Sequence, residues 1–85
     1  MHKKATYNLA VGIVLRELQD ERHVGRDKLA TALETSDAEI TQIENGDQRM
    51  TAGELILMLT TFDLSWEDFM QKVRNKLSEA EAKIL

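Results

Sequence analysis

Several side chains with hydrogen-bonding chemistry lie between residues 36 and 49 of the sequence. Gln42 carries an amide that both donates and accepts hydrogen bonds, a pattern that pairs bidentately with the N6 and N7 edge of adenine. Thr41 offers a hydroxyl that suits a base edge or a phosphate, and Ala38 offers a methyl group that suits the methyl of thymine. The alternative interpretation is a polar helical face that contacts only water.

Catalytic chemistry finds few residues in this chain. Cysteine is absent, and the two histidines, His2 and His23, fall in an expected terminal arm and an expected loop. The four glycines stand at positions 12, 25, 46 and 53, a spacing that matches neither a dinucleotide nor a Walker phosphate-binding loop. We therefore predict a protein that is not an enzyme and that has no cofactor and no metal site.

The composition indicates one all-helical domain. The chain has 85 residues and a mass of 9.7 kDa, and 42% of its residues are hydrophobic, which is enough for one modest core. It contains no proline and only four glycines, so few positions interrupt a helix. Without cysteine, neither disulfides nor thiolate-bound zinc can stabilise the domain, and side-chain packing must do so.

Charge is distributed unevenly along the chain. The net charge of -4 and the isoelectric point of about 5.1 argue against a protein whose whole surface binds nucleic acid. Both ends are basic and the middle is acidic, with +2 over residues 1–15, -3 over 35–50, -4 over 51–70 and +2 over 71–85. Lys3 and Lys4 are candidates to follow a phosphate backbone, with a solvated terminus as the alternative, whereas Lys72, Arg74 and Lys76 are interpreted as a solvated helix face.

The amino-terminal segment is not expected to be a signal peptide. Lys3 and Lys4 precede the apolar run of residues 9–15, but Arg16 and Glu17 follow where a cleavable signal needs small residues. No apolar run approaches the ~18 residues of a membrane span. We expect a cytoplasmic protein with no membrane partner.

Hydrophobic spacing and start signals predict five helices joined by short turns. Ser36 with Glu39 is expected to form a reciprocal capping box, and Asn45-Gly46 is expected to end the helix that follows. The same start signal recurs at Thr51 and Ser65. The expected helices cover residues 8–21, 26–33, 36–45 and 51–62, and a fifth runs from residue 65 into the carboxyl-terminal segment. In that segment Ser78 with Glu81 either breaks the last helix or lies on its surface.

Four stretches of the sequence share a pattern with a known family. They are Leu15-Arg16-Glu17-Leu18, Lys28-Leu29-Ala30, Ile40-Thr41-Gln42-Ile43-Glu44-Asn45-Gly46 and Leu64-Ser65-Trp66-Glu67-Asp68-Phe69. Over residues 11–70 the chain resembles, without insertion or deletion, the Cro and lambda-repressor-like helix-turn-helix family, also called XRE-like. The resemblance implies a five-helix domain that contains a helix-turn-helix, followed by a carboxyl-terminal helical extension.

The resemblance also implies how each residue of the helix-turn-helix is used. Family members dimerise and set the third helix of each subunit into the major groove of double-stranded DNA. By position, Arg26 falls where members bind a phosphate, and Asn45 and Arg49 flank the helix end near the phosphates. The DNA-binding set implied for this chain is Arg26, Ser36, Asp37, Ala38, Thr41, Gln42, Asn45 and Arg49.

The domain organisation expected from this comparison has three parts. Residues 1–8 form a basic arm, residues 9–70 the helix-turn-helix domain, and residues 71–85 a helical extension. In the extension, apolar residues repeat at spacings of 4, 3 and 4, namely Val73, Leu77, Ala80 and Ile84. They form either a dimerisation seam or a face that packs on the same subunit. Trp66 is a core residue or part of a dimer surface.

The sequence departs from the family pattern at several positions near the proposed interface. Gln19 replaces a frequent arginine that pairs with a buried glutamate, here Glu44, so that link is either a neutral hydrogen bond or is made elsewhere. Glu34 replaces the usual turn glycine, and Gly25 replaces the usual serine or threonine cap. Asp37 brings a carboxylate to the reading face, where it stabilises the helix start or accepts a hydrogen bond from cytosine N4.

Two functions are compatible with these observations. The resemblance implies a sequence-specific transcriptional regulator, with a repressor that binds a palindromic operator as a homodimer as the expected role. The alternative is an acidic helix-turn-helix module that binds another protein, as the antagonist of a regulator, with weak or no DNA binding. The carboxylates of residues 35–70 motivate this alternative.

Overall fold

The all-helical architecture predicted from the sequence is confirmed. The structure is a computed structural model that describes the backbone of residues 3–84 and the side chains of residues 6–79. Within that range it contains helices and no strand. The helices are α1 (Lys3–Arg22), α2 (Arg26–Ala32), α3 (Asp37–Glu44), α4 (Ala52–Phe62) and α5 (Trp66–Ile84).

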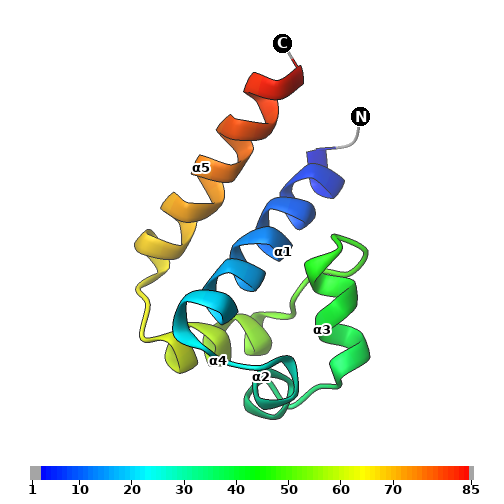
Figure 1. The fold of residues 1–85 in the computed structure, drawn as a ribbon, viewed down its shortest axis with the longest axis vertical. Coiled ribbons are helices and arrows are strands. Elements are labelled where there is room, and N and C mark those ends of the chain that lie inside the picture. The colour runs from blue at the N-terminus through cyan, green and yellow to red at the C-terminus, as the bar shows by residue number, and fades with distance from the viewer. Residues whose placement is uncertain (1–2, 85) are drawn as a thin grey trace.

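Helix α1 is the central element of the fold. The long helices α1 and α5 run beside each other, and α2, α3 and α4 gather around the carboxyl-terminal half of α1 (Figure 1). Helix α1 packs against both α5 and α3, while α2 packs against α3 and α4. Arg22 Nη1 donates to the carbonyl oxygen of Phe62 at 2.7 Å and ties the end of α1 to the end of α4. The position of α3 is therefore set by α1 and α2 together.

One apolar core joins all five helices. Leu15, Leu29, Ile40 and Met58 are fully buried, and each such side chain contributes about 1.5–3 kcal/mol relative to an exposed one. The remaining buried apolar residues are Ala10, Val14, Leu18, Ala30, Leu33, Ile43, Phe62, Phe69 and Val73. Since α3 contributes both of its isoleucines, its orientation depends on this core.

Helix α1 begins earlier than the sequence analysis expects. The prediction places its start at residue 8, whereas the helix begins at Lys3, so residues 3–8 of the expected arm are helical. No glycine or proline interrupts this segment, and Lys and Ala are good helix formers. The side chains of Lys3 and Lys4, and residues 1–2 altogether, lie outside the described part of the chain.

The capping signals are formed to different extents. Thr51 and Glu54 make the full reciprocal box, in which the Thr51 hydroxyl accepts from the Glu54 amide at 3.1 Å and the Glu54 carboxylate accepts from the Thr51 amide at 2.9 Å. At α3 only half of the predicted box forms. Ser36 Oγ accepts from the Glu39 amide at 3.2 Å, but the Glu39 carboxylate accepts a hydrogen bond from the Thr35 hydroxyl. The competing hydroxyl one residue earlier explains the difference.

Helix α5 continues without a break past Ser78, so this residue lies on the helix surface and does not end the helix. Val73 is buried in the core of its own subunit and Leu77 packs against that core, whereas the side chains of Ala80 and Ile84 lie outside the described part. Lys76 Nζ lies 2.7 Å from Glu17 Oε2 of α1. The hydrogen bond to Glu17 is the main cause that raises the pKa of the Lys76 ammonium above its ordinary value.

At Gly12 the backbone of α1 approaches that of α3 closely. A Cβ atom at this position would lie 2.3 Å from the carbonyl oxygen of Ile43 and 2.5 Å from that of Glu44. Both distances are far below van der Waals contact, so the backbones of the two helices meet here with no side chain between them. At the end of α3, Gly46 adopts the left-handed conformation expected of the stop signal, with φ of 80°.

The turn between α2 and α3 carries local strain. Glu34 has φ of 58°, a conformation that costs a residue with a Cβ atom about 1–2 kcal/mol. We expect Glu34→Gly to raise the free energy of unfolding by about 0.5–1 kcal/mol, because glycine removes the steric cost but adds freedom to the unfolded chain. Urea denaturation of the two proteins measures this difference.

Glu34→Ala is the matched control for that substitution. Alanine removes the same charge but keeps the Cβ atom, so the strain remains and no comparable gain in stability is expected. Equal gains from the alanine and glycine variants would show that the charge, and not the backbone, is responsible.

Over the described residues, no helix combines the length and the hydropathy that crossing a bilayer requires.

Candidate nucleic-acid interface

Helices α2 and α3 form a compact helix-turn-helix unit. Helix α2 has Leu33 as its carboxyl-terminal cap, and the amide of Thr35 donates to the carbonyl oxygen of Ala30 at 2.9 Å across the turn. Ser36 then caps α3. Leu29, Ala30, Ile40 and Ile43 bury the facing sides of the two helices, so the pair packs as one body on α1 and α4.

Helix α3 has one buried and one exposed face. Ile40, Ile43 and Glu44 point into the protein. Most of the residues assigned from the sequence to DNA are exposed, and Thr41 is half-buried; on and beside α3 the exposed ones are Ser36, Asp37, Ala38, Gln42, Asn45 and Arg49. The structure therefore brings this part of the set onto one side of the helix, while its contact with DNA remains a prediction.

The polar side chains on this face differ in the hydrogen bonds that they already make within the protein. Thr41 Oγ1 donates to the carbonyl oxygen of Asp37 at 3.1 Å, which uses the hydroxyl hydrogen and leaves the oxygen as an acceptor. The Ser36 hydroxyl accepts from the Glu39 amide and so serves the helix start. The side chains of Gln42 and Asn45 make no hydrogen bond to any described residue, so both amides are uncommitted.

A buried network joins the end of α3 to α1 and α2. Gln19 Nε2 donates to Glu44 Oε2 at 2.6 Å and Arg26 Nη2 donates to Glu44 Oε1 at 2.8 Å. The Glu44 side chain is only 4% exposed, whereas that of Arg26 is 44% exposed. Both alternatives left open by the sequence are therefore realised, because Gln19 supplies a neutral hydrogen bond and Arg26 supplies the positive charge.

Arg26 thus has an intramolecular partner that the sequence analysis did not assign to it. It stands at the first position of α2, after Gly25, which caps the helix without a side-chain hydrogen bond. The partly exposed guanidinium still has donors beyond the one that Glu44 occupies. Its contact with a phosphate remains a prediction.

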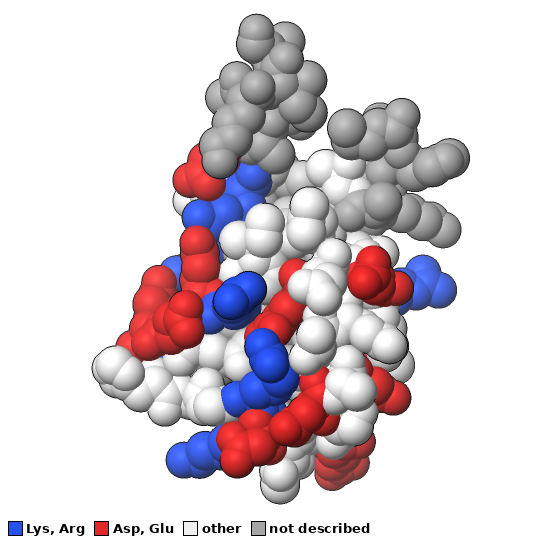
Figure 2. Space-filling model, turned by 45° about the vertical axis from the view of Figure 1, so that its right-hand side comes forward, with Lys and Arg blue, Asp and Glu red and all other residues white. Residues whose placement is uncertain are grey.

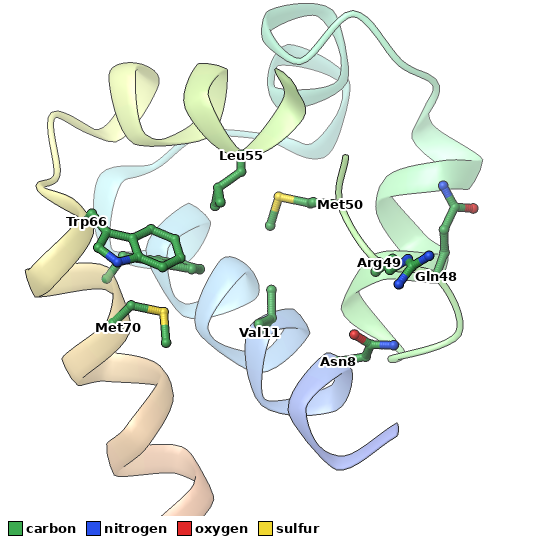
Figure 3. A pocket seen from close by; sticks show the side chains of 9 residues that line it. Asn8, Val11, Gln48, Arg49, Met50, Leu55, Trp66 and Met70 are labelled. Atoms are coloured by element: carbon green, nitrogen blue, oxygen red, sulfur yellow. The ribbon is translucent and has the colours of Figure 1, made fainter. Parts of the chain in front are cut away.

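Arg49 lies in the loop between α3 and α4 and makes no ion pair with any described residue. Beside it is an apolar cavity of about 190 Å³. Trp66, Met70, Leu55, Met50 and Val11 form its apolar side, and Gln48, Arg49 and Asn8 lie at its polar end (Figure 3). Trp66 is 49% exposed, so the first of its two alternatives, a core position, is not observed.

Charge on this side of the molecule is mixed. Figure 2 shows Lys and Arg side chains next to Asp and Glu side chains, without a continuous basic surface. Arg26, Lys28 and Arg49 are exposed cations around the helix-turn-helix, and Asp37 and Asp47 are exposed carboxylates close to them in sequence. No group of three His, Cys, Asp or Glu residues that could hold a metal ion is found among the described residues.

Two residues that matter for this site were missed in the sequence analysis. Gly12 sets the distance between α1 and α3, and its signal was a glycine inside a helical pattern, where alanine is the better helix former. Lys28 is an exposed cation two residues after Arg26, which makes it a further candidate for a phosphate contact.

The comparisons with known proteins decide the family. The model of the helix-turn-helix domain family matches residues 10–69, which span all of α2, α3 and α4. This chain belongs to the helix-turn-helix domain family. The resemblance to Cro and lambda-repressor-like proteins is confirmed with it. In DNA-binding helix-turn-helix domains the second helix of the motif is the recognition helix, and α3 occupies that position in this chain.

Solved structures share the fold of this helix-turn-helix domain at low sequence identity. One structure of the clp gene regulator ClgR from Corynebacterium glutamicum has a TM-score of 0.85 and 19% identity, covering 91% of this chain and 82% of that one. A second structure of ClgR has a TM-score of 0.77 and 20% identity, covering 84% of this chain and 91% of that one. Among curated proteins, none matches this chain by sequence.

Proposed function

We propose that this chain is a sequence-specific DNA-binding regulator of transcription that acts without enzymatic activity, in the cytoplasm. The observation that carries the proposal is the polar, exposed face of α3 within a helix-turn-helix domain. The buried face of the same helix is fixed in the core, so the exposed side chains are presented on a rigid support. Similarity to ClgR, whose structure is described as that of a clp gene regulator, supports the regulatory role.

In this proposal α3 enters the major groove and its side chains contact base edges. Gln42 pairs with adenine, Thr41 accepts from a base or sits beside a phosphate, and Ala38 contacts a thymine methyl group. Arg26, Asn45 and Arg49 contact the phosphates on either side of the groove. The exposure of these side chains supports the assignment.

Selection from random duplexes tests the proposal. The full chain is immobilised, incubated at low salt with duplexes that contain a randomised segment, and the retained DNA is sequenced. A recurrent sequence motif supports the proposal, and steep weakening of binding with salt supports phosphate contacts. Failure to retain any duplex above a non-binding control contradicts it.

Gln42→Ala is expected to reduce affinity for the selected sequence by about 5–150-fold, the equivalent of 1–3 kcal/mol for one bidentate base contact. Binding to random duplexes is expected to change little, because Gln42 reads a base and not a phosphate. Titration of labelled duplexes followed by fluorescence anisotropy measures both affinities.

Gln71→Ala is the matched control for the same experiment, since it removes an exposed glutamine from α5 instead of α3. It is expected to leave both affinities unchanged. A Gln42 variant that loses specific and random binding equally would contradict base reading by this residue.

We further propose a homodimer on a palindromic operator. A second apolar groove, of about 380 Å³, lies between α1 and α5 and shares Val11 and Met70 with the cavity beside Trp66. Tyr7 at its edge is 48% exposed. Continuous apolar surface of this kind supports association of two copies. Sedimentation velocity of the free chain, and a two-fold symmetric motif in the selected DNA, test the dimer.

Repression is the expected outcome of operator binding, because a dimer that occupies an operator blocks a promoter without needing further contacts. A reporter gene placed behind the selected sequence tests this role. Lower reporter expression on production of the protein supports repression, and higher expression contradicts it.

An acidic protein-binding module is the alternative function. Residues 35–70 contain eight carboxylates and one arginine, and the mixed charge seen in Figure 2 does not resemble an electrostatic surface made for DNA. No retention of any duplex at low salt would favour this alternative. Partners captured from the native host would then be compared with those of a variant in which Asp37 and Asp47 are neutralised.

A further inference from the structure

The carboxylate of Glu44 is held by one neutral and one charged partner from different helices. Gln19 of α1 donates to one oxygen, and the same nitrogen also donates to the carbonyl oxygen of Leu15 at 3.3 Å. Both hydrogens of that amide group are therefore used, and Gln19 cannot turn away without losing two bonds. Arg26 of α2 donates to the other oxygen at 2.8 Å.

Arg26 is the only cation paired with Glu44 among the described residues. A carboxylate that is 4% exposed cannot be left without positive charge at low cost, so the pair restrains the Arg26 side chain as well as Glu44. A guanidinium has five N–H donors in a fixed plane, and the partly exposed Arg26 uses one of its terminal nitrogens for Glu44. The other donors can bind a second anion while the pair remains intact.

We infer that Glu44 is a positioning residue, which holds the Arg26 guanidinium in one place so that its remaining donors meet a DNA phosphate. This inference rests on the proposed function. A free surface arginine loses rotamer freedom when it binds a phosphate, whereas Arg26 has already lost it on folding. Because Gln19 is neutral, the fold of α3 and the phosphate contact of α2 depend on the same guanidinium.

Binding to random-sequence DNA tests the inference, since phosphate contacts do not require an operator. The probe is a labelled duplex of about 24 base pairs, titrated at about 50–200 mM salt. Arg26→Gln is expected to weaken binding about 5–10-fold at low salt. The slope of the logarithm of the binding constant against the logarithm of the salt concentration is expected to become less steep by ~0.9, which corresponds to the loss of one phosphate contact. Glu44→Gln is expected to weaken binding about 3–10-fold with the slope unchanged, because the contact remains but is no longer preorganised.

The double variant separates positioning from a structural role. If Glu44 acts through Arg26, Glu44→Gln in the Arg26→Gln background adds no further loss of affinity. Lys28→Gln is the control, since Lys28 is an exposed cation on the same helix with no ion pair to Glu44. Its effect is expected to add to that of Glu44→Gln. Additive losses for Arg26 and Glu44 would overturn the inference while leaving DNA binding by the wild type in place, whereas a wild type that binds no duplex overturns both proposals.

A second variant covers the case in which Glu44→Gln does not fold. Gln19→Arg supplies a second cation to Glu44 from α1 and keeps the carboxylate paired. In NMR spectra of the arginine side chains, the Arg26 guanidinium is expected to rotate slowly in the wild type and freely in Gln19→Arg. Random-duplex affinity is then expected to fall several-fold although the protein has gained a positive charge. Slow rotation in both proteins, or a gain in affinity, would overturn the inference.

Discussion

Gly12→Ala is expected to lower the free energy of unfolding by about 2–3 kcal/mol. The added Cβ would stand 2.3 Å from the Ile43 carbonyl oxygen and 2.5 Å from that of Glu44, and both are backbone atoms that cannot rotate aside. Helices α1 and α3 must move apart, which costs more than the ~1 kcal/mol that alanine gains in helix propensity. For a domain of this size the melting temperature should fall by about 10–20 °C in a thermal scan.

Gly53→Ala is the matched control for Gly12→Ala. Gly53 also lies inside a helix, but a Cβ atom there meets nothing within 4 Å. The same substitution is therefore expected to stabilise the protein by about 0.5–1 kcal/mol. If both alanine variants changed stability in the same direction, the close approach of α1 and α3 would not be the determining contact.

Glu44→Ala is expected to cost about 2–3 kcal/mol of unfolding free energy. It removes the acceptor of the buried Gln19 amide, leaves a cavity at the end of α3 and frees Arg26. The effect is below that of breaking a fully buried ion pair, because the Arg26 side chain is 44% exposed and returns to water. Urea denaturation measures the loss.

Asp47→Ala provides the comparison for Glu44→Ala, since it removes an exposed carboxylate three residues later. Its effect is expected to stay within about 0.5 kcal/mol. A similar loss in the two variants would mean that net charge, and not the buried network, governs stability.

Helix α3 was largely predictable from the sequence because its signals are local. Ile40 and Ile43 mark the buried face by spacing, Ser36 marks the start, and Gly46 marks the end by its tolerance of positive φ. Once those are placed, the outward direction of Gln42 follows from helical geometry. The family pattern then supplied the fold, because its four matching stretches occur in order along the chain.

The unpredicted features depend on contacts between distant segments. The ion pair between Arg26 and Glu44 joins residues 18 positions apart. Nothing in the sequence spacing distinguishes an arginine that makes this pair from one that contacts only water. The role of Gly12 depends on how α1 crosses α3, which periodicity does not encode. The half-formed box at Ser36 depends on competition from the Thr35 hydroxyl. In each case the deciding contact is made by a partner that the local sequence pattern does not specify.

The meeting of bare backbones at Gly12 leaves α3 no room to tilt independently of α1, and α1 is packed in turn on α5. In a two-fold complex each reading helix would therefore move only with its whole protomer. Such a complex could bind half-sites with a longer or shorter spacing only if the dimer interface rearranged or the DNA bent. In the proposed dimer, tolerance to spacing would then depend on the dimer contact and on the DNA, and not on the helix-turn-helix.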